Sequence, residues 1–170
     1  MKDISFRDDI MPLGDGLFRM AIRLQLPRQE AEDVVQETML RLWQRRQQWA
    51  DMDNIEAFAM TICRNLCLDV LRRSARRTDN AEATIYAMPD TAHSASPERQ
   101  AESHDRIAQV RRLIAQLPEK QRTCMTLRDL EGKPYRDIAQ IMQISEEQVK
   151  VNIFRARQTV KRLFSAIEAQ

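Results

Sequence analysis

Residues 134–157 hold two short helical patterns around a tight turn, and this arrangement limits how the C-terminal part of the chain can fold. The first pattern covers Tyr135–Met142, and Gln143 and Ile144 form the turn after it. Ser145 follows where an N-cap is expected, because its hydroxyl group can accept a backbone hydrogen bond from the next turn. Two helices around so short a turn predict a helix-turn-helix, whose second helix enters the DNA major groove.

The second pattern predicts a long amphipathic helix. Its apolar stripe alternates steps of four and three and consists of Val149, Ile153, Ala156, Val160, Leu163 and Ile167. Long polar side chains at the start of the helix can reach base edges, and the Lys and Arg residues beside them can bind phosphates. The candidate DNA-binding residues there are Ser145, Glu147, Gln148, Lys150, Val151, Asn152, Arg155 and Arg157. An ordinary amphipathic surface helix is the alternative for this segment.

The composition favours an all-α protein of the cytoplasm. The 170 residues include only 3 Gly and 6 Pro, and β-branched runs are few. No window approaches the roughly 18 apolar residues of a membrane span, and the N-terminus lacks the apolar core of a secretory signal. The 3 Cys show no disulfide spacing, which is consistent with a reducing compartment.

Charge divides the chain into three parts. The overall net charge of +2 combines +1 in residues 1–77, −5 in residues 78–105 and +6 in residues 106–170. The middle part is rich in Ala, Ser and Thr and shows no apolar period. We therefore expect two small helical domains, 1–77 and 106–170, joined by a flexible acidic linker over 78–105.

The first domain is predicted to contain a helix from Pro12 to Leu26 and a second from Arg28 to Gln48. The inward face of the second consists of Ala31, Val35, Thr38, Met39 and Leu42. Its outward face carries Asp33, Glu37, Leu40 and Gln44, with Gln36 and Trp43 at the edges. A leucine among carboxylates and amides suits a protein-docking stripe, although a solvated face with one stray leucine is an equal alternative.

A third helix is expected over residues 54–77. Its inward residues are Ile55, Ala59, Ile62, Cys63, Leu66 and Val70. Its outward residues are Thr61, Arg64, Asn65, Leu68, Arg72 and Arg76, with Asp69 and Arg73 beside them. The terminal arginines suit backbone phosphates, or else complement the helix dipole and keep the domain in solution. The loop Trp49–Asn54 before this helix is short and polar and could hold an unstacked base, although nothing in the local sequence demands it.

Several stretches in this order resemble bacterial extracytoplasmic function (ECF) RNA polymerase sigma factors. Residues 33–43 and 57–73 are similar to the N-terminal domain of that family. Residues 117–122, followed by the helix-turn-helix and the triplet 155–157, are similar to its C-terminal domain. The resemblance covers nearly the whole chain and leaves only the linker unmatched.

The resemblance implies roles for these stretches. The helix matching 33–43 would dock on the β′ clamp helices of core RNA polymerase through Asp33, Gln36, Glu37, Leu40 and Trp43. The promoter −10 element would be recognised and melted by Asn54, Arg64, Asn65, Asp69, Arg72, Arg73 and Arg76. The loop Trp49–Asn54 would capture a flipped non-template base, which costs a few kcal/mol of unstacking. The recognition helix would read the −35 element, and the acidic linker would lie along the RNA-exit path.

The family also implies further partners. They are the β flap of the polymerase and an anti-sigma factor, often at the inner membrane, whose candidate contacts are Leu40, Leu68, Val151 and Phe154. Two features depart from the family pattern. Gln143 stands where the turn usually has Gly, so a different or strained turn is expected, and Val151 and Asn152 replace a common Ser-Arg pair.

No enzyme signature is visible in the sequence. There is no Gly-rich phosphate loop, nucleophile elbow or carboxylate–histidine set. Cys63, Cys67 and Cys124 are expected in the core as small apolar residues rather than as metal ligands, and no cofactor is expected. The competing hypothesis is a stand-alone helix-turn-helix repressor or activator that binds duplex DNA as a dimer.

Overall fold

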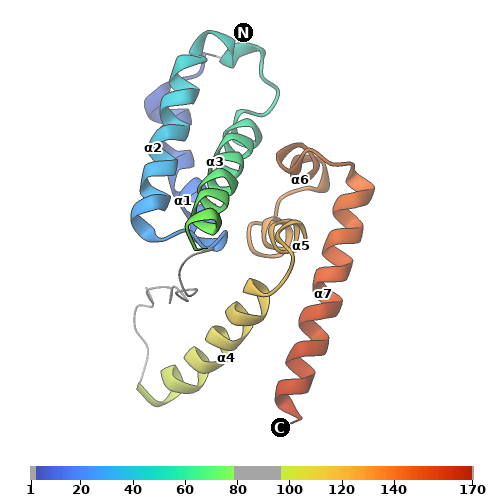
Figure 1. Ribbon diagram of the computed structural model, residues 1–170. Helices are drawn as coiled ribbons and strands as arrows, with labels where there is room; N and C mark the ends of the chain where they lie inside the picture. Colours follow the sequence, from blue (N-terminus) through green and yellow to red (C-terminus); the bar gives the residue numbers. More distant parts are fainter. Residues whose placement is uncertain (1–2, 79–96, 170) are drawn as a thin grey trace. The chain divides into compact units, whose positions relative to one another are not determined.

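The computed structural model describes residues 3–78 and 97–169, apart from the side chains of 78 and 97–104, and in these ranges the chain forms only helices and connecting turns (Figure 1). The chain divides into two compact units. The first contains the helices before residue 79, and the second contains α4, α5, η4, α7 and most of α6. Within these ranges no helix combines the length and apolarity that a membrane span requires. The predicted all-α class with a helix-turn-helix in its C-terminal part is confirmed.

The first unit is built on three helices, α1 (Gly14–Arg23), α2 (Arg28–Gln44) and α3 (Ile55–Thr78). Short turns precede α1 and α3: η1 (Phe6–Ile10), η2 (Met11–Leu13) and η3 (Arg46–Asp51). The three α-helices contact one another pairwise. At Gly14 of α1, an added Cβ would lie 3.4 Å from the Met39 Cε atom of α2. The core of this unit includes Leu17, Met20, Ala21, Leu24, Ala31, Val34, Leu42, Ala59, Met60, Cys63 and Cys67.

Two helices of this unit end earlier than the periodicity predicts. α1 ends at Arg23 because Gln25 adopts a left-handed φ of 74°, and Gln25 N–H and Leu26 N–H donate to the Ile22 and Ala21 carbonyls. This pair of bonds is a Schellman motif, which closes a helix. α2 ends at Gln44 instead of residue 48, since the buried Trp49 folds back and its indole Nε1–H donates to the Leu42 carbonyl over 3.0 Å.

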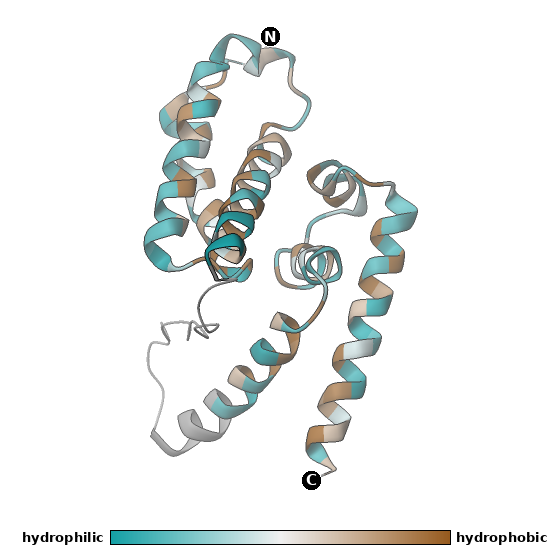
Figure 2. Ribbon diagram, viewed as in Figure 1, coloured by the Kyte–Doolittle hydropathy of each residue, from teal (hydrophilic) through white to brown (hydrophobic). Residues whose placement is uncertain are grey.

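The second unit packs α5 (Glu119–Met125) and α4 (Pro97–Ala115) against α7 (Glu146–Glu168). η4 (Thr126–Leu130) continues α5, and α6 (Tyr135–Met142) leads into α7. A cluster of Leu117, Met125 and Ala156 forms part of the core, with Ile114 and Val160 packed beside it. Figure 2 shows apolar residues interrupted by polar ones along these helices, as expected for amphipathic elements.

The predicted linker is partly helical. α4 begins at Pro97, so residues 97–105 belong to a helix rather than to a flexible segment. Proline suits the first position of a helix, and the Ala, Glu, Gln and Arg residues that follow have high helix propensity. Residues 79–96 of the predicted linker lie outside the described residues.

Candidate nucleic-acid interface

The turn between α6 and α7 adopts the strained conformation expected for Gln143. Its φ is +58°, in the left-handed region where glycine is preferred. Gln143 N–H donates to the Gln140 carbonyl over 3.3 Å, and Ile144 N–H donates to the Ala139 carbonyl over 3.1 Å. The turn is therefore a Schellman motif that closes α6 and directs the chain into α7.

Ser145 caps α7 as predicted. Its Oγ accepts from Gln148 N–H, and Gln148 Oε1 accepts from Ser145 N–H, each over 3.1 Å. This reciprocal pair is a capping box, which satisfies backbone donors at the start of a helix. The capping box engages polar atoms of both side chains, which were also candidate DNA contacts, and leaves the Gln148 amide nitrogen for a base.

The faces of α7 agree with the predicted periodicity. Val149, Ile153 and Ala156 are buried, Val160 and Leu163 are half-buried, and Ile167 is exposed near the end of the helix. The exposed candidate DNA contacts are Ser145, Glu147, Gln148, Lys150, Val151, Arg155 and Arg157. Asn152 is half-buried, and its Nδ2 donates to the Gln148 carbonyl over 2.8 Å, which directs its side chain along the start of the helix.

Arg157 was predicted to meet DNA, but the structure engages it within the unit. Its Nε donates to Asp129 Oδ2 over 3.0 Å, and its Nη2 donates to Asp129 Oδ1. The hydrogen bond with Asp129 raises the pKa of Arg157. The sequence reading missed this pair because the partners lie 28 residues apart and belong to different helices.

Tyr135 is a second feature that the sequence reading missed. The Arg128 guanidinium lies 4.4 Å from the centroid of its ring, and Lys150 Nζ lies 5.6 Å from the same centroid. A cation over an aromatic face is attracted by the ring quadrupole. The ring therefore holds Lys150, a predicted DNA contact, near the start of α6.

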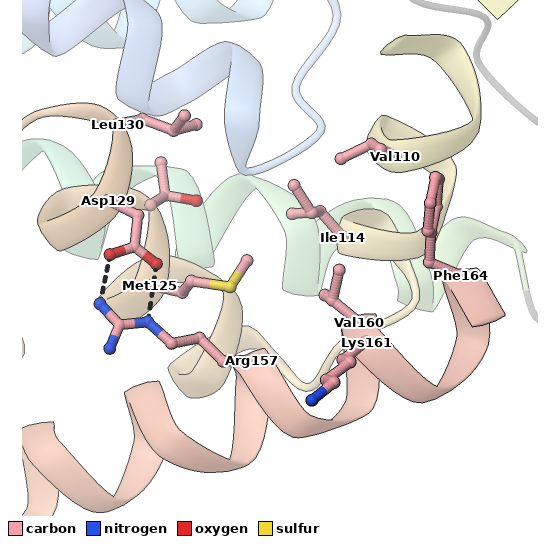
Figure 3. Close-up of a pocket in the computed structure, with 10 residues that line it drawn as sticks. Val110, Ile114, Met125, Asp129, Leu130, Arg157, Val160, Lys161 and Phe164 are labelled. Atoms are coloured by element: carbon pink, nitrogen blue, oxygen red, sulfur yellow. Dashed lines mark hydrogen bonds and ion pairs between the residues drawn. The ribbon is translucent and has the colours of Figure 1, made fainter. Parts of the chain in front are cut away.

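An open apolar cavity of about 400 Å³ lies on the second unit, between α4, η4 and α7 (Figure 3). Its walls carry Val110, Ile114, Met125, Thr126, Leu130, Val160 and Phe164. Asp129, Arg157 and Lys161 also line it, so the cavity combines an apolar floor with charged side chains. Leu130 is 59% exposed, which is unusual for a leucine and leaves apolar surface for a partner.

Residues 117–122, one of the stretches that resemble the ECF sigma factors, connect the end of α4 to α5 and form its first turn. Arg122 is buried, and its Nη1 donates to the carbonyl of Ala115, the last residue of α4. Burial lowers the pKa of Arg122, and the nearby Glu119 carboxylate opposes that shift. The motif thus has a structural role here, since a buried cation holds the end of one helix at the start of the next.

In the first unit, α2 presents the predicted docking stripe. Asp33 and Gln36 are exposed, and Glu37 is half-buried and paired with Arg41 over 3.0 Å. Leu40 is 50% exposed and Trp43 is 44% exposed. Four of the five predicted residues are therefore exposed, and Glu37 is half-buried.

On α3, Arg64 does not face outward as predicted. It is only 6% exposed and lies on a buried row with Ala57, Met60 and Cys67. The predicted inward stripe was centred near Ile62, which is only half-buried, so the buried arc is displaced around the helix toward Arg64. The long side chain of arginine can cover apolar surface with its methylene groups, which makes such burial possible.

Four of the other candidate −10 residues are exposed, and two are half-buried. Asn54 caps α3, because its Oδ1 accepts from Ala57 N–H over 3.0 Å. Asn65, Arg72, Arg73 and Arg76 are exposed, and the half-buried Asp69 pairs with Arg72 over 3.4 Å. An exposed arginine row therefore follows the last turns of α3.

The candidate base-capturing loop begins with a residue that is not accessible. Trp49 is 5% exposed and packs against Phe6 and Trp43, so its ring faces are not available to stack on a base. The accessible part of the loop is its second half, where Asp51 and Asp53 are exposed and Met52 is half-buried.

The cysteines occupy the core as expected. Cys63, Cys67 and Cys124 are buried free thiols. A hydrogen bond with Cys63, together with burial, raises the pKa of Cys67 far above that of an ordinary thiol. Within the described ranges no three His, Cys, Asp or Glu side chains are grouped as a metal site would require.

The sequence of each unit matches a known protein family. Residues 10–77 match sigma-70 region 2, and residues 107–160 match sigma-70 region 4.

Similar proteins agree with these matches. The RNA polymerase sigma-H factor of Pseudomonas aeruginosa is 31% identical over 150 residues, which are 83% of this chain and 76% of that protein. The ECF RNA polymerase sigma factor SigL of Mycobacterium tuberculosis is 33% identical over 135 residues, 79% of this chain and 74% of that protein. Among solved structures, the sigma factor RpoE of Bartonella quintana, in complex with the anti-sigma factor NepR, has a similar fold. Its TM-score is 0.73 at 22% identity, over 94% of this chain and 96% of that chain. The chain therefore belongs to the ECF RNA polymerase sigma factors.

Proposed function

We propose that this sigma factor binds core RNA polymerase through the outward stripe of α2 and reads a bipartite promoter with α3 and α7. As a member of its family, the chain directs transcription initiation at promoters and works with a separate catalytic enzyme, in the cytoplasm where that enzyme acts. The observation that carries the assignment is the combination of two surfaces in one chain. One unit has an acidic and apolar docking stripe on α2 and an arginine row on α3, and the other has a capped helix-turn-helix.

For the polymerase, the contact residues are Asp33, Gln36, Glu37, Leu40 and Trp43. The half-exposed Leu40 and Trp43 supply apolar surface, and the carboxylates supply charge for basic partners on the β′ clamp helices. The apolar cavity beside Leu130 offers a second contact, which we assign to the β flap.

For the −10 element, the proposed contacts are Asn54, Asn65, Asp69, Arg72, Arg73 and Arg76. The exposed arginines follow the backbone phosphates, and the second half of the loop 49–54 takes the flipped base. Arg64 is left out of this set because it is buried.

For the −35 element, the proposed base contacts are Glu147, Gln148, Val151, Asn152 and Arg155, with Lys150 on a phosphate. Lys150 is held over Tyr135, which fixes its position before DNA arrives. Arg157 is left out of the direct contacts because two of the five N–H donors of its guanidinium already meet Asp129.

We further propose that an anti-sigma factor restrains this protein. The exposed apolar residues Leu40, Val151 and Phe154 support such a partner, whereas Leu68 is half-buried and contributes less surface. A stand-alone helix-turn-helix regulator would need a dimer or effector domain in its first 77 residues, where this chain instead matches sigma-70 region 2.

Run-off transcription with purified core polymerase tests the proposal. The template carries a promoter found by sequencing the transcripts that rise when the protein is overproduced. We expect a promoter-dependent transcript that requires both this chain and the core enzyme. Tight binding of the chain alone to the DNA, with no such transcript, would contradict the proposal.

A further inference from the structure

Phe6 contacts both tryptophans of the chain. The centroid of its ring lies 5.4 Å from that of Trp43, with an interplanar angle of 81°, and 6.5 Å from that of Trp49, with an angle of 17°. Trp43 and Trp49 lie 6.2 Å apart. These three residues form what we call the aromatic cluster. Edge-to-face and offset pairs at such distances add stability beyond the apolar area that they bury.

The members of the aromatic cluster come from three segments with different places in the proposed function. Trp43 lies at the end of α2, in the polymerase-docking stripe, and Trp49 begins the loop 49–54. Phe6 lies in η1, and the match to sigma-70 region 2 begins only at residue 10. The contact therefore joins a segment outside the family match to two elements inside it.

Local structure fixes the position of Phe6. Ser5 N–H donates to Asp9 Oδ2 over 2.8 Å, and Ser5 Oγ accepts from Asp8 N–H over 3.4 Å, so η1 has a reciprocal cap. At the other end of η1, Ile10 is completely buried. Phe6 is thus presented to the indoles by a segment that is itself held at both ends.

η3 is held to the end of α2 on the same side. The Arg46 guanidinium lies 4.6 Å from the Trp43 ring centroid, and its Nη1 donates to the Trp43 carbonyl over 3.1 Å. Trp49 Nε1–H donates to the Leu42 carbonyl. Besides Trp43, the ring of Phe6 also packs on Trp49, and it lies nearly parallel to the indole.

We propose that Phe6 is a positioning residue for −10 recognition, because it fixes the loop 49–54 relative to α2 by packing on Trp43 and Trp49. The inference rests on the proposed function and adds the segment Ser5–Ile10 to it. Trp43 keeps 44% of its surface exposed within the aromatic cluster, so the same residue can meet the polymerase.

The test compares Phe6→Leu with Phe6→Tyr, which keeps the ring, and with Phe18→Leu, which removes a half-buried ring of α1 outside the aromatic cluster. Holoenzyme made with each variant is titrated with single-stranded non-template oligonucleotides that carry the correct −10 sequence or one changed base. We expect Phe6→Leu to lower the preference for the correct base by about threefold to tenfold, the size of one or two aromatic contacts. Affinity for core polymerase should stay within about twofold, and Phe6→Tyr and Phe18→Leu should keep the wild-type preference.

Tryptophan fluorescence of the free full-length variants gives an independent readout, since the only 2 Trp of the chain both belong to the aromatic cluster. Phe6→Leu should shift the emission to longer wavelength, and Phe18→Leu should not. An unchanged base preference in Phe6→Leu would overturn the inference. It would not affect the proposed function, which the run-off transcription assay tests separately. Equal losses of polymerase affinity and base preference, or an equal loss in Phe18→Leu, would show that Phe6 only stabilises the unit and would also overturn it.

Discussion

Asp129 of η4 and Arg157 of α7 form a two-point ion pair that joins the recognition helix to the helix before the helix-turn-helix. Arg157 Nε lies 3.0 Å from Asp129 Oδ2, and the second bond joins Nη2 to Oδ1. The fork of a guanidinium matches the two oxygens of a carboxylate, which adds geometric specificity to the attraction. Both side chains also line the apolar cavity of this unit (Figure 3). The pair therefore links η4 to α7 at the edge of the cavity.

A double-mutant cycle measures this pair. The side chains are 52% and 37% exposed, so solvent screens the attraction, and we expect a coupling free energy of about 0.5 to 1 kcal/mol between Asp129→Ala and Arg157→Ala. Urea unfolding followed by circular dichroism supplies the four free energies of unfolding. The coupling should shrink in about 1 M salt. Additive effects at low salt would show that the pair adds no stability.

Arg155 and Arg157 are expected to differ in their effect on −35 recognition. Arg155→Ala and Asn152→Ala should each lower −35-dependent transcription by about tenfold, the value of a good base contact, without abolishing polymerase binding. Arg157→Ala is the matched control, because it removes the same side chain from a position engaged by Asp129. Unchanged promoter output from both Asn152→Ala and Arg155→Ala would remove these residues from the readout, and equal losses from Arg155→Ala and Arg157→Ala would assign Arg157 a contact with DNA.

Gln143→Gly should stabilise the turn between α6 and α7. Gln143 has a φ of +58°, and a left-handed conformation costs a residue with a Cβ about 1 to 2 kcal/mol. Glycine removes that cost but loses more chain entropy on folding, so a net gain of up to about 1 kcal/mol is expected. The gain is read from the urea midpoint by circular dichroism. Gln143→Ala serves as the control, since alanine keeps the Cβ and should give no comparable gain.

The buried thiol of Cys67 should make the first unit less stable at alkaline pH. Its pKa is raised in the folded state by the hydrogen bond with Cys63 and by burial. The folded state therefore keeps a proton that the unfolded chain loses above about pH 8.5, the pKa of an ordinary thiol. This contribution to stability is complete below that pH and is lost as the pH rises, by about 1.4 kcal/mol per pH unit.

Urea unfolding at pH 8 and pH 10 checks the sign of this effect. Tryptophan fluorescence follows the first unit, since both indoles belong to it. Cys67→Ala should lose less stability between the two pH values than the wild type, because alanine has no proton to release. The same fall in both proteins would show that other groups cause it.

Much of the candidate site could be predicted from the sequence because it depends on neighbours within one or two helical turns. The Ser145 cap, the apolar stripe from Val149 and the outward Asp33 and Leu40 follow from residue spacing and capping chemistry. The strain at Gln143 could also be predicted, since the position is one that glycine usually occupies. The ends of helices were predicted less well, because the Trp49 indole that helps end α2 bonds back over seven residues.

The sequence by itself determined two helical parts separated by an acidic segment, with a helix-turn-helix in the second part, because helical periodicity, caps and net charge are local properties. Only the tertiary structure decided that Arg64 is buried, that Arg157 is held by Asp129, and that Phe6 joins the tryptophans. The physical reason is the same in all three cases. A helix face shows which residues share a side, but packing against other helices decides which side is covered and which distant side chains meet.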